Sequence, residues 1–513
     1  MSHSDKRGLT MNKSAGIAII CLLLIMSVPA GTKTISAQGC TSYDNDVDGY
    51  PEFDTDCSVI DCDDYDPSVN PGAAEVIGNC MDDDCNPNTS DESITIGDWH
   101  ITCIDLDTSG VDTHSSLALD SSENIHISYI GREGLTYTTN STGIWTTDVL
   151  DSSTAQMANT SIAIDSSDNV HISYWKMGEG LKYITDLYGF WVQPVILDTD
   201  GWDNSMTIDS SDNVHISYVE YMYPNFTLKY KTKINNIWVT ETIDNDATNP
   251  SITRDFLDIM NIVYYDRATT SLKHATNSSG SWTMNTIDNS GDVGYGYLSS
   301  TIDSADNLHV SYFDNTNDNL KYATNESGSW ATNTLEFGIG LEGTYNSIDV
   351  DSSNKVHISY IDVTNLLQYA INVSGDWLSY TIDGEFPKAY RHTSLKIDAS
   401  DNVHIIYQLI YKNGGLKYAT TRCTNPPLRT TEDISTYYSS LQDTYDAAVN
   451  GNTIQSVRIT LNEDIIIDND KAVTIQSGYN CNYSNIIGAT TINGNVTINS
   501  GSLILADGNL IIQ

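Results

Sequence analysis

The chain has 513 residues, enough for several domains with buried cores. It carries 24 Lys and Arg against 68 Asp and Glu, a formal net charge of −44. This balance argues against binding nucleic acid or an anionic bilayer through charge, and it favours cations.

Residues 1–30 have the features of an export signal. Lys6, Arg7 and Lys13 precede the apolar run Ile17–Met26, and small residues at Val28–Ala30 suit cleavage. The apolar run is too short to span a bilayer comfortably. We therefore expect a secreted, extracellular or cell-surface protein with no membrane insertion after signal cleavage; an uncleaved anchor is the alternative.

Eight cysteines remain once the signal is removed, an even number that predicts disulfides in an exported chain. They are Cys40, Cys57, Cys62, Cys80, Cys85, Cys103, Cys423 and Cys481. One hypothesis joins Cys103 to Cys423 as a clamp across the ends of the repeat region described below. The other pairings stay open.

Residues 40–92 form an acidic, Cys-rich module with sixteen Asp and Glu and no Lys or Arg. Asp44, Asp46 and Asp48 stand on alternate positions before Gly49, a pattern of oxygen ligands that suits Ca²⁺. The loop is not a complete EF-hand, because its twelfth position is Thr55, flanked by Asp54 and Asp56, where a Glu is expected.

The second half of this module contains D-C-D-D-Y-D-P at residues 61–67 and P-G-A-A-E at residues 71–75. In this order the two motifs closely resemble the metal-binding motif of MopE-type bacterial surface proteins. The resemblance implies a small disulfide-held module with a structural calcium ion; Val76–Asn79 precede Cys80 where the family often has a cysteine directly. The alternative is a solvated acidic linker. The candidate metal ligands are Asp44, Asp46, Asp48, Asp54, Asp61, Asp63, Asp64, Asp66, Asp82 and Asp84.

Residues 98–423 consist of a repeat marked by a histidine in V-H-I-S-Y-like segments. The marker recurs seven times at intervals of 44 to 48 residues, as His126, His171, His215, Asn261, His309, His357 and His404. This is the period of a β-propeller blade. We read each histidine as a structural hydrogen-bonding group that ties its blade to a Ser or Asp nearby, rather than as a metal ligand.

Each repeat predicts four strands. In the second copy, Ser161–Asp165 lead into the turn Ser166–Asn169, and Val170–Tyr174 leave it with alternating apolar residues. The Asp residues of this turn read as turn formers rather than calcium ligands. A third strand follows at Leu181–Tyr183, and a tryptophan then opens a fourth strand that ends in T-I-D.

The tryptophans predict how the ring closes. They stand after six of the seven copies, at Trp145, Trp191, Trp238, Trp282, Trp330 and Trp377, and the seventh copy has none. Trp99–Asp105 reads as a fourth strand without a blade before it. We therefore predict that this segment pairs with Leu416–Thr420 and completes the last blade.

Residues 424–438 read as a linker and residues 439–513 as a capping helix, Ser440–Asn450, followed by short strands separated by Gly, Asn and Asp turns. These strands resemble the start of a pectate-lyase-like β-helix of bacterial surface proteins. A small β-sandwich is the alternative, and because the chain stops within a predicted strand at Gln513, we expect either a truncated segment or an end that pairs with a partner. The fold class is thus all-β: a seven-bladed propeller between a calcium module and a β-helix-like region.

The turn Thr276–Ser281 before Trp282 is similar to the Asp-box turn of sialidase-like propellers, although it uses Asn and has one residue fewer between Gly and Trp. Such enzymes need clustered arginines, and here Arg132, Arg254, Arg267 and Arg391 do not share one offset in the repeat. These residues favour a non-catalytic protein over an enzyme, and no catalytic residue is assigned.

The function expected is non-catalytic recognition or adhesion, with carbohydrate or a surface protein bound on a propeller face. The alternatives are an extracellular polysaccharide-degrading enzyme, either a glycoside hydrolase or a lyase, and a purely structural surface protein. The candidate ligand-binding residues are Trp175, Tyr221, Tyr223, Tyr265 and Phe313.

Overall fold

The computed structural model describes residues 46, 50, 67–74, 83–86, 94–96, 99–105 and 114–513, with gaps at 154, 188, 297, 337–344, 374, 384–389, 410–414, 424–425, 433–435, 482, 484–485, 487 and 507. The chain divides into two units, Met1–Pro71 and Gly72–Gln513. The predicted signal and most of the acidic module lie outside the described residues. Within the described ranges no helix is both long enough and apolar enough to cross a bilayer.

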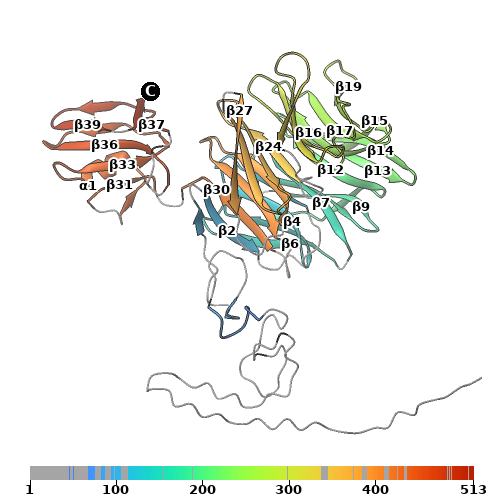
Figure 1. The fold of residues 1–513 in the computed structure, drawn as a ribbon, viewed down its shortest axis with the longest axis horizontal. Coiled ribbons are helices and arrows are strands. Elements are labelled where there is room, and N and C mark those ends of the chain that lie inside the picture. The colour runs from blue at the N-terminus through green and yellow to red at the C-terminus, as the bar shows by residue number, and fades with distance from the viewer. Residues whose placement is uncertain are drawn as a thin grey trace, which may run out of the picture. The chain divides into compact units, whose positions relative to one another are not determined.

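Seven antiparallel sheets form the propeller, which confirms the predicted number of blades (Figure 1). Blade 1 comprises β3 (Ser115–Leu119), β4 (Ile125–Gly131), β5 (Gly134–Thr139) and β6 (Thr146–Ser152). Blade 2 comprises β7 (Met157–Ile164), β8 (Val170–Lys176), β9 (Gly180–Leu187), β10 (Phe190–Trp191) and β11 (Val195–Asp198). Blade 3 comprises β12 (Gly201–Ile208), β13 (Val214–Met222), β14 (Asn225–Ile234) and β15 (Ile237–Asn245).

The remaining blades repeat this order. Blade 4 comprises β16 (Ala247–Arg254), β17 (Met260–Asp266), β18 (Ser271–Thr276) and β19 (Thr283–Asp288). Blade 5 comprises β20 (Ser299–Ile302), β21 (Leu308–Asp314), β22 (Asn319–Thr324) and β23 (Ala331–Glu336). Blade 6 comprises β24 (Asn346–Val350), β25 (Val356–Ile361), β26 (Leu367–Val373) and β27 (Asp376–Asp383), and blade 7 comprises β28 (Tyr390–Ile397), β29 (Val403–Leu409) and β30 (Gly415–Thr420).

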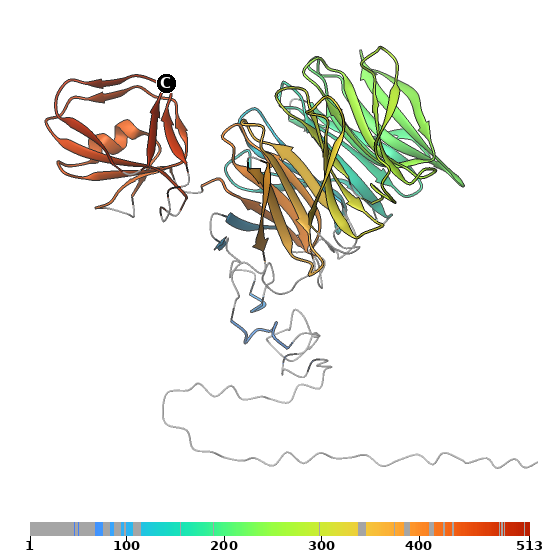
Figure 2. The same cartoon turned by 45° about the horizontal axis from the view of Figure 1, so that its top comes forward.

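The N-terminal strand completes blade 7, as the sequence predicts. β2 (Trp99–Asp105) pairs antiparallel with β30, with His100 opposite Thr420 and Cys103 opposite Lys417. The two strands lie side by side, blue against orange, in Figures 1 and 2. A fifth strand that was not predicted, β1 (Ile94–Ile96), pairs with the outer edge of β2. Closure with the first strands of the domain removes an open edge between the ends of the ring.

A ring of serines joins the innermost strands. In every blade one Ser Oγ accepts a hydrogen bond from a backbone N–H of the next blade, at 3.0–3.3 Å. The acceptors are Ser116, Ser161, Ser205, Ser251, Ser299, Ser347 and, closing the circle onto Leu117, Ser394. Each bond satisfies a backbone donor that faces the narrow centre, where no ladder partner is available.

A second ring is aromatic. Each blade tryptophan packs edge-on against an aromatic ring of the preceding blade, with centroids 4.9–5.6 Å apart. The seven pairs are Trp99–Tyr369, Trp145–Tyr418, Trp191–Tyr137, Trp238–Tyr183, Trp282–Tyr230, Trp330–His274 and Trp377–Tyr322. The two pairs that close the ring therefore have the same geometry as the other five.

The repeated histidines are structural, as predicted. In six blades Nδ1 lies 2.5–2.6 Å from a buried Tyr hydroxyl. In the same blades Nε2 lies 3.1–3.4 Å from the carboxylate of the Asp that opens the hairpin turn. The predicted partner, a Ser or an Asp, is thus an Asp in these blades, and the Tyr hydroxyl is a second partner that was not predicted. In blade 4, Asn261 stands at the position of the histidine and His274 at that of the tyrosine, and Oδ1 of Asn261 lies 2.9 Å from Nε2 of His274.

The turn aspartates also act as predicted. Asp165 accepts hydrogen bonds from the backbone N–H groups of Ser167 and Asn169, while Asp168 adopts a left-handed φ of 62°. Asp168 in addition accepts from both the N–H and the hydroxyl of Ser121 in the neighbouring blade. The turn therefore also joins adjacent blades.

The predicted Cys103–Cys423 clamp is wrong, because Cys423 is bonded to Cys481, with Cα atoms 5.1 Å apart. The strand register explains the error. Cys103 lies opposite Lys417, six residues before Cys423, which corresponds to roughly 20 Å along an extended chain. Cys85 and Cys103 are disulfide-bonded as well.

The C-terminal part contains α1 (Leu441–Ala447) and short strands in three ladders. The strands are β31 (Leu428–Thr430), β32 (Tyr437–Tyr438), β33 (Thr453–Val457), β34 (Thr460–Leu461), β35 (Ile465–Ile467), β36 (Ala472–Tyr479), β37 (Ala489–Ile492), β38 (Val496–Ile498), β39 (Ser502–Ala506) and β40 (Asn509–Ile512). From β33 onward the chain visits the ladders in turn and all pairs are parallel, so successive coils stack.

Ser440 caps the N-terminus of α1, because its side chain accepts from the N–H of Asp443. The helix, seen in Figure 2, buries Leu441 and Tyr445 in the core of this part. The predicted capping helix is present, although it ends before Asn450. The resemblance to a pectate-lyase-like domain stays a prediction.

Candidate functional site

Four innermost strands carry a β-bulge near one end, and each bulge has one residue with a left-handed φ. These residues are Asn159, Asp203, Asn249 and His392, with φ between 41° and 53°. A bulge places a residue outside the regular ladder and can turn its side chain toward a binding site. Asp203 is the one carboxylate at these four positions, which distinguishes blade 3 from the others.

A cavity of about 580 Å³ opens beside Asp203, at the ends of blades 3, 4 and 5. Its lining residues are Trp202, Asp203, Tyr221, Phe226, Thr248, Asn249, Arg267, Tyr295, Gly296 and Asn315. Trp202, Tyr221 and Tyr295 are 40%, 42% and 53% exposed. Large aromatic surfaces left open to solvent beside a few polar groups are typical of a ligand pocket.

One position of the repeat supplies three of these residues. Tyr221, Arg267 and Asn315 each stand three residues after the last tyrosine of the V-H-I-S-Y-like segment, in blades 3, 4 and 5. Trp202 and Thr248 likewise share a position, directly before the bulge residues of blades 3 and 4. The cavity is therefore built from equivalent positions that carry different side chains.

Aromatic pairs support the cavity wall. The ring of Trp202 packs on Trp175 of blade 2, with centroids 4.8 Å apart. Tyr295 packs on Tyr265 at 5.4 Å, and the Tyr265 hydroxyl donates to Asp292 at 2.8 Å. Burial and the neighbouring Asp292 raise the pKa of Tyr265 above its usual value, so it stays a neutral donor. Each exposed ring is thus held by a second aromatic ring behind it.

Arg267 is held rigidly in the cavity wall. Its guanidinium lies over the ring of Phe226, 3.8 Å from the centroid. Its Nη1 donates to the carboxylate of Asp246 at 2.9 Å, and its backbone N–H donates to the Asp246 carbonyl. Only one guanidinium nitrogen donates to a protein group within the described part of the chain, which leaves further N–H donors for a ligand.

Asp203 has one carboxylate oxygen engaged. Oδ2 accepts the backbone N–H of Asn249 at 2.8 Å, and the structure assigns no protein donor to Oδ1 among the described residues. Desolvation raises the pKa of Asp203 to about 6, and the Asn249 N–H offsets part of that effect. A carboxyl group with this pKa in a cavity changes charge just below neutral pH.

The central channel meets this cavity at Asp203, Asn249 and Gly296, which line both. The channel has a volume of about 190 Å³ and a wall of small polar residues, mostly the serines of the inner ring and their neighbours. Its serine hydroxyls already accept hydrogen bonds from the next blade. Most of the aromatic and charged side chains that a ligand could contact therefore lie in the cavity beside Asp203 rather than in the channel.

The candidate residues from the sequence have mixed outcomes. Tyr221 lines the cavity, Trp175 and Tyr265 support it from behind, and Tyr223 is 85% exposed outside it. Phe313 is fully buried in the core between blades 5 and 6, so it offers no surface to a ligand. Of the candidate metal ligands, Asp46 and Asp84 are described and the others lie outside the described residues. Among the described residues, no group of three or more His, Cys, Asp or Glu could hold a metal ion.

Sequence reasoning missed Trp202, Asp203, Phe226 and Tyr295, and it discounted Arg267. The available signal was variation at equivalent positions of the repeat. A position that varies among Tyr, Arg and Asn in consecutive blades cannot serve the shared architecture, so it is free to serve a ligand.

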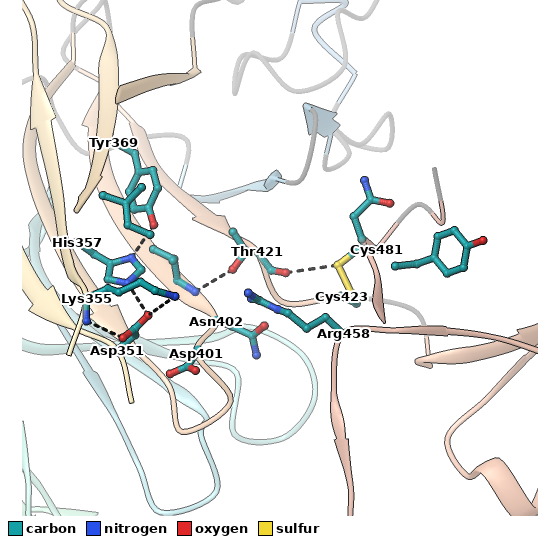
Figure 3. Close-up of a pocket in the computed structure, with 14 residues that line it drawn as sticks. Asp351, Lys355, His357, Tyr369, Asp401, Asn402, Thr421, Cys423, Arg458 and Cys481 are labelled. Carbon is teal, nitrogen blue, oxygen red and sulfur yellow. Dashed lines mark hydrogen bonds and ion pairs between the residues drawn. A yellow bond between two sulfur atoms is a disulfide. The ribbon is translucent and has the colours of Figure 1, made fainter. Parts of the chain in front are cut away.

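A second cavity, of about 220 Å³, lies beside the Cys423–Cys481 disulfide (Figure 3). The close-up shows His357 between Tyr369 and Asp351, the same arrangement that recurs in the other blades. These side chains are already engaged in the blade architecture, and we assign no ligand site there.

No protein-family model matches the chain, and no curated protein matches it. Solved structures resemble its propeller. A mutant of the Aleuria aurantia lectin in complex with Fucα1-6GlcNAc is 10% identical, with 53% of this chain and 96% of that chain covered and a TM-score of 0.40. The polysaccharide lyase Uly1 is 9% identical, covering 60% and 90%, with a TM-score of 0.41. A Hadza microbial sialidase is 8% identical, covering 60% and 65%, with a TM-score of 0.40. These likenesses concern the β-propeller fold and carry no conclusion about a ligand.

Proposed function

We propose that this protein binds carbohydrate, without cleaving it, in the cavity at the ends of blades 3 to 5. The observation that supports this most directly is the combination of exposed aromatic faces with a few fixed polar groups. The C–H face of a sugar ring packs on Trp202 or Tyr295, while its hydroxyls meet Asp203, Arg267 and Asn315. A volume of about 580 Å³ accommodates one or two sugar rings.

The lining argues for binding rather than hydrolysis. Glycoside hydrolysis generally uses a pair of carboxylates about 5–10 Å apart across the scissile bond. Within the described part of the chain, Asp203 is the one carboxylate that lines the cavity. A polysaccharide-degrading activity, the alternative from the sequence, would appear as release of reducing sugar, and we expect none.

The test is a glycan array probed with the full chain, followed by calorimetry on the glycans that bind. Trp202→Ala is expected to weaken binding at least tenfold, since loss of a large stacking face typically removes a main anchor. Phe190→Ala is the matched control, because Phe190 is 77% exposed on β10 and lies outside the cavity. Equal loss in both variants, or no glycan bound by the native chain, would refute the proposal.

We also propose that residues 40–92 bind a structural calcium ion in an exported protein. The support is the alternating Asp44, Asp46 and Asp48 before Gly49, together with the disulfides of the chain. Calorimetric titration of the oxidised full chain with Ca²⁺ should release heat that is lost when Asp44, Asp46 and Asp48 are changed together to Asn. If the native chain released no heat, the alternative interpretation of residues 40–92 as a solvated acidic linker would be supported instead.

A further inference from the structure

The charges around the cavity restrict which sugars it can accept, given that the proposed function is correct. Among the described residues of the lining, Arg267 is the one cation, and it is paired with Asp246 at 2.9 Å. Asp203 adds a carboxylate that no described cation pairs with. The chain as a whole carries a formal charge of −44, which repels polyanions at long range. An anionic sugar would therefore meet no uncompensated positive charge.

The free hydrogen-bonding groups instead match neighbouring hydroxyls. Oδ1 of Asp203 can accept a hydroxyl proton, and the remaining N–H groups of Arg267 can donate to a hydroxyl oxygen. Hydrogen bonds to ionised groups are roughly twice as strong as neutral ones. The Asp203 backbone lies in a bulge with a left-handed φ, and the Asn249 N–H holds one carboxylate oxygen at 2.8 Å, so the carboxylate is oriented without a ligand.

We infer that the cavity binds a neutral, hydroxyl-bearing saccharide through the ionised carboxylate of Asp203, and that mild acid releases this ligand. When Asp203 is ionised, its Oδ1 is a charged acceptor for a ligand hydroxyl. Protonation makes the carboxyl group neutral, and its hydrogen bonds to the ligand become weaker. Asp203 is therefore the residue that decides between neutral and acidic sugars.

The surroundings of Asp203 allow it to titrate as a single group. The titratable groups that share the cavity with it are Arg267, Tyr221 and Tyr295. Apart from tyrosines, the ionisable groups on strands packed against β12 are His171 and Lys176 (β8), Lys182 and Asp186 (β9), His215 and Glu220 (β13), and Arg254 (β16), together with Asp246 directly before β16. Each of these eight except Asp186 contacts an acidic or basic side chain elsewhere, and Asp186 accepts backbone N–H groups of Val170 and Gly189. The pKa of Asp203, about 6, arises from desolvation and the Asn249 N–H alone.

The test uses an array of neutral glycans (hexoses, deoxyhexoses and N-acetylhexosamines) and acidic glycans (uronates, sialylated and sulfated sugars), probed with the full chain at pH 7.5 and pH 5. Neutral glycans should bind at pH 7.5 and bind about tenfold more weakly at pH 5, since about nine tenths of a group with a pKa near 6 is then protonated. Asp203→Asn should bind about tenfold more weakly at pH 7.5 and lose the pH dependence.

Asp148→Asn is the matched control, because Asp148 is exposed on the outer strand β6, and it should behave as the native chain at both pH values. Preference for acidic glycans, equal binding of neutral glycans at both pH values, or an unchanged pH dependence in Asp203→Asn would overturn this inference while leaving carbohydrate binding intact. Binding of no glycan at all would overturn the proposed function as well.

Discussion

At the centre and between the blades of the propeller the same contact recurs seven times with nearly the same residue types, whereas around the cavity equivalent positions carry a different residue in each blade. The serine ring and the tryptophan ring tolerate almost no variation. The position three residues after the repeat tyrosine is Tyr221, Arg267 and Asn315 in blades 3 to 5. Uniform positions hold the ring together, and variable positions at its face are available for recognition.

The blade 4 exchange shows how strictly the uniform positions are kept. Where other blades pair a histidine with a tyrosine, blade 4 pairs Asn261 with His274 at 2.9 Å and still packs Trp330 on the His274 ring. Both residues of the pair differ from those of the other blades, and a hydrogen bond between the same two strands is still present.

The largest effect on stability is expected from Asp288→Ala. Asp288 accepts the Tyr312 hydroxyl at 2.7 Å and the Lys321 ammonium at 2.5 Å, joining blade 4 to blade 5. All three side chains are buried, so removing the carboxylate leaves a buried cation without its main partner. We expect a loss of about 3–5 kcal/mol in the free energy of unfolding, measured by urea titration. Asp148→Ala, on the exposed face of β6, should change it by less than about 0.5 kcal/mol. A loss under about 1 kcal/mol in Asp288→Ala would contradict the structural role of this pair.

The second largest effect on the free energy of unfolding is expected from acid, and blade 4 should be the blade most sensitive to it. Burial lowers the pKa of His274 to about 4, because Asn261 offers it no carboxylate. The unfolded chain, with a histidine pKa near 6.5, binds more protons than the folded one between pH 6.5 and 4. Stability is therefore full above pH 6.5 and falls as the pH drops, by about 2 kcal/mol at pH 5 from this one residue.

The matched comparison for this effect is His171, whose pKa is also lowered by burial but is raised in part by Asp165. His274→Gln should flatten the dependence of unfolding free energy on pH more than His171→Gln does. A greater change from His171→Gln would show that the carboxylate partner does not moderate the burial of these rings.

The uniform and variable positions also differ in how far the sequence predicts them. The 44- to 48-residue period, the tryptophans and the displaced Trp99 suffice to predict the blade count and the strand that closes the ring, because each reports a contact repeated in every blade. Three of the predicted ligand candidates, Trp175, Tyr265 and Phe313, stand directly after the repeat tyrosine, while Tyr221 and Tyr223 stand further along the chain. The position directly after the repeat tyrosine is covered by neighbouring blades where it carries the fully buried Phe313 and Val219, and it is partly buried where it carries Trp175. Two positions further on, the chain reaches the face of the propeller. How deeply a residue of a strand is buried depends on how neighbouring blades pack against it. The alternation of apolar and polar residues within one strand does not reveal this packing.

The smallest effect on stability is expected at the cavity itself, from Tyr295→Ala. Tyr295 is 53% exposed, and its main contact is the edge of Tyr265 at 5.4 Å, so the free energy of unfolding should change by less than about 0.5 kcal/mol. Binding of a neutral glycan should nevertheless weaken several-fold, because one face available to a sugar ring is lost. Tyr380→Ala provides the control, since Tyr380 is 50% exposed on the outer strand β27 of blade 6 and lies away from the cavity. If Tyr295→Ala lowered the free energy of unfolding as much as it lowered the free energy of binding, Tyr295 would be a structural residue of the ring. The distinction between uniform structural positions and variable recognition positions would then not hold at Tyr295.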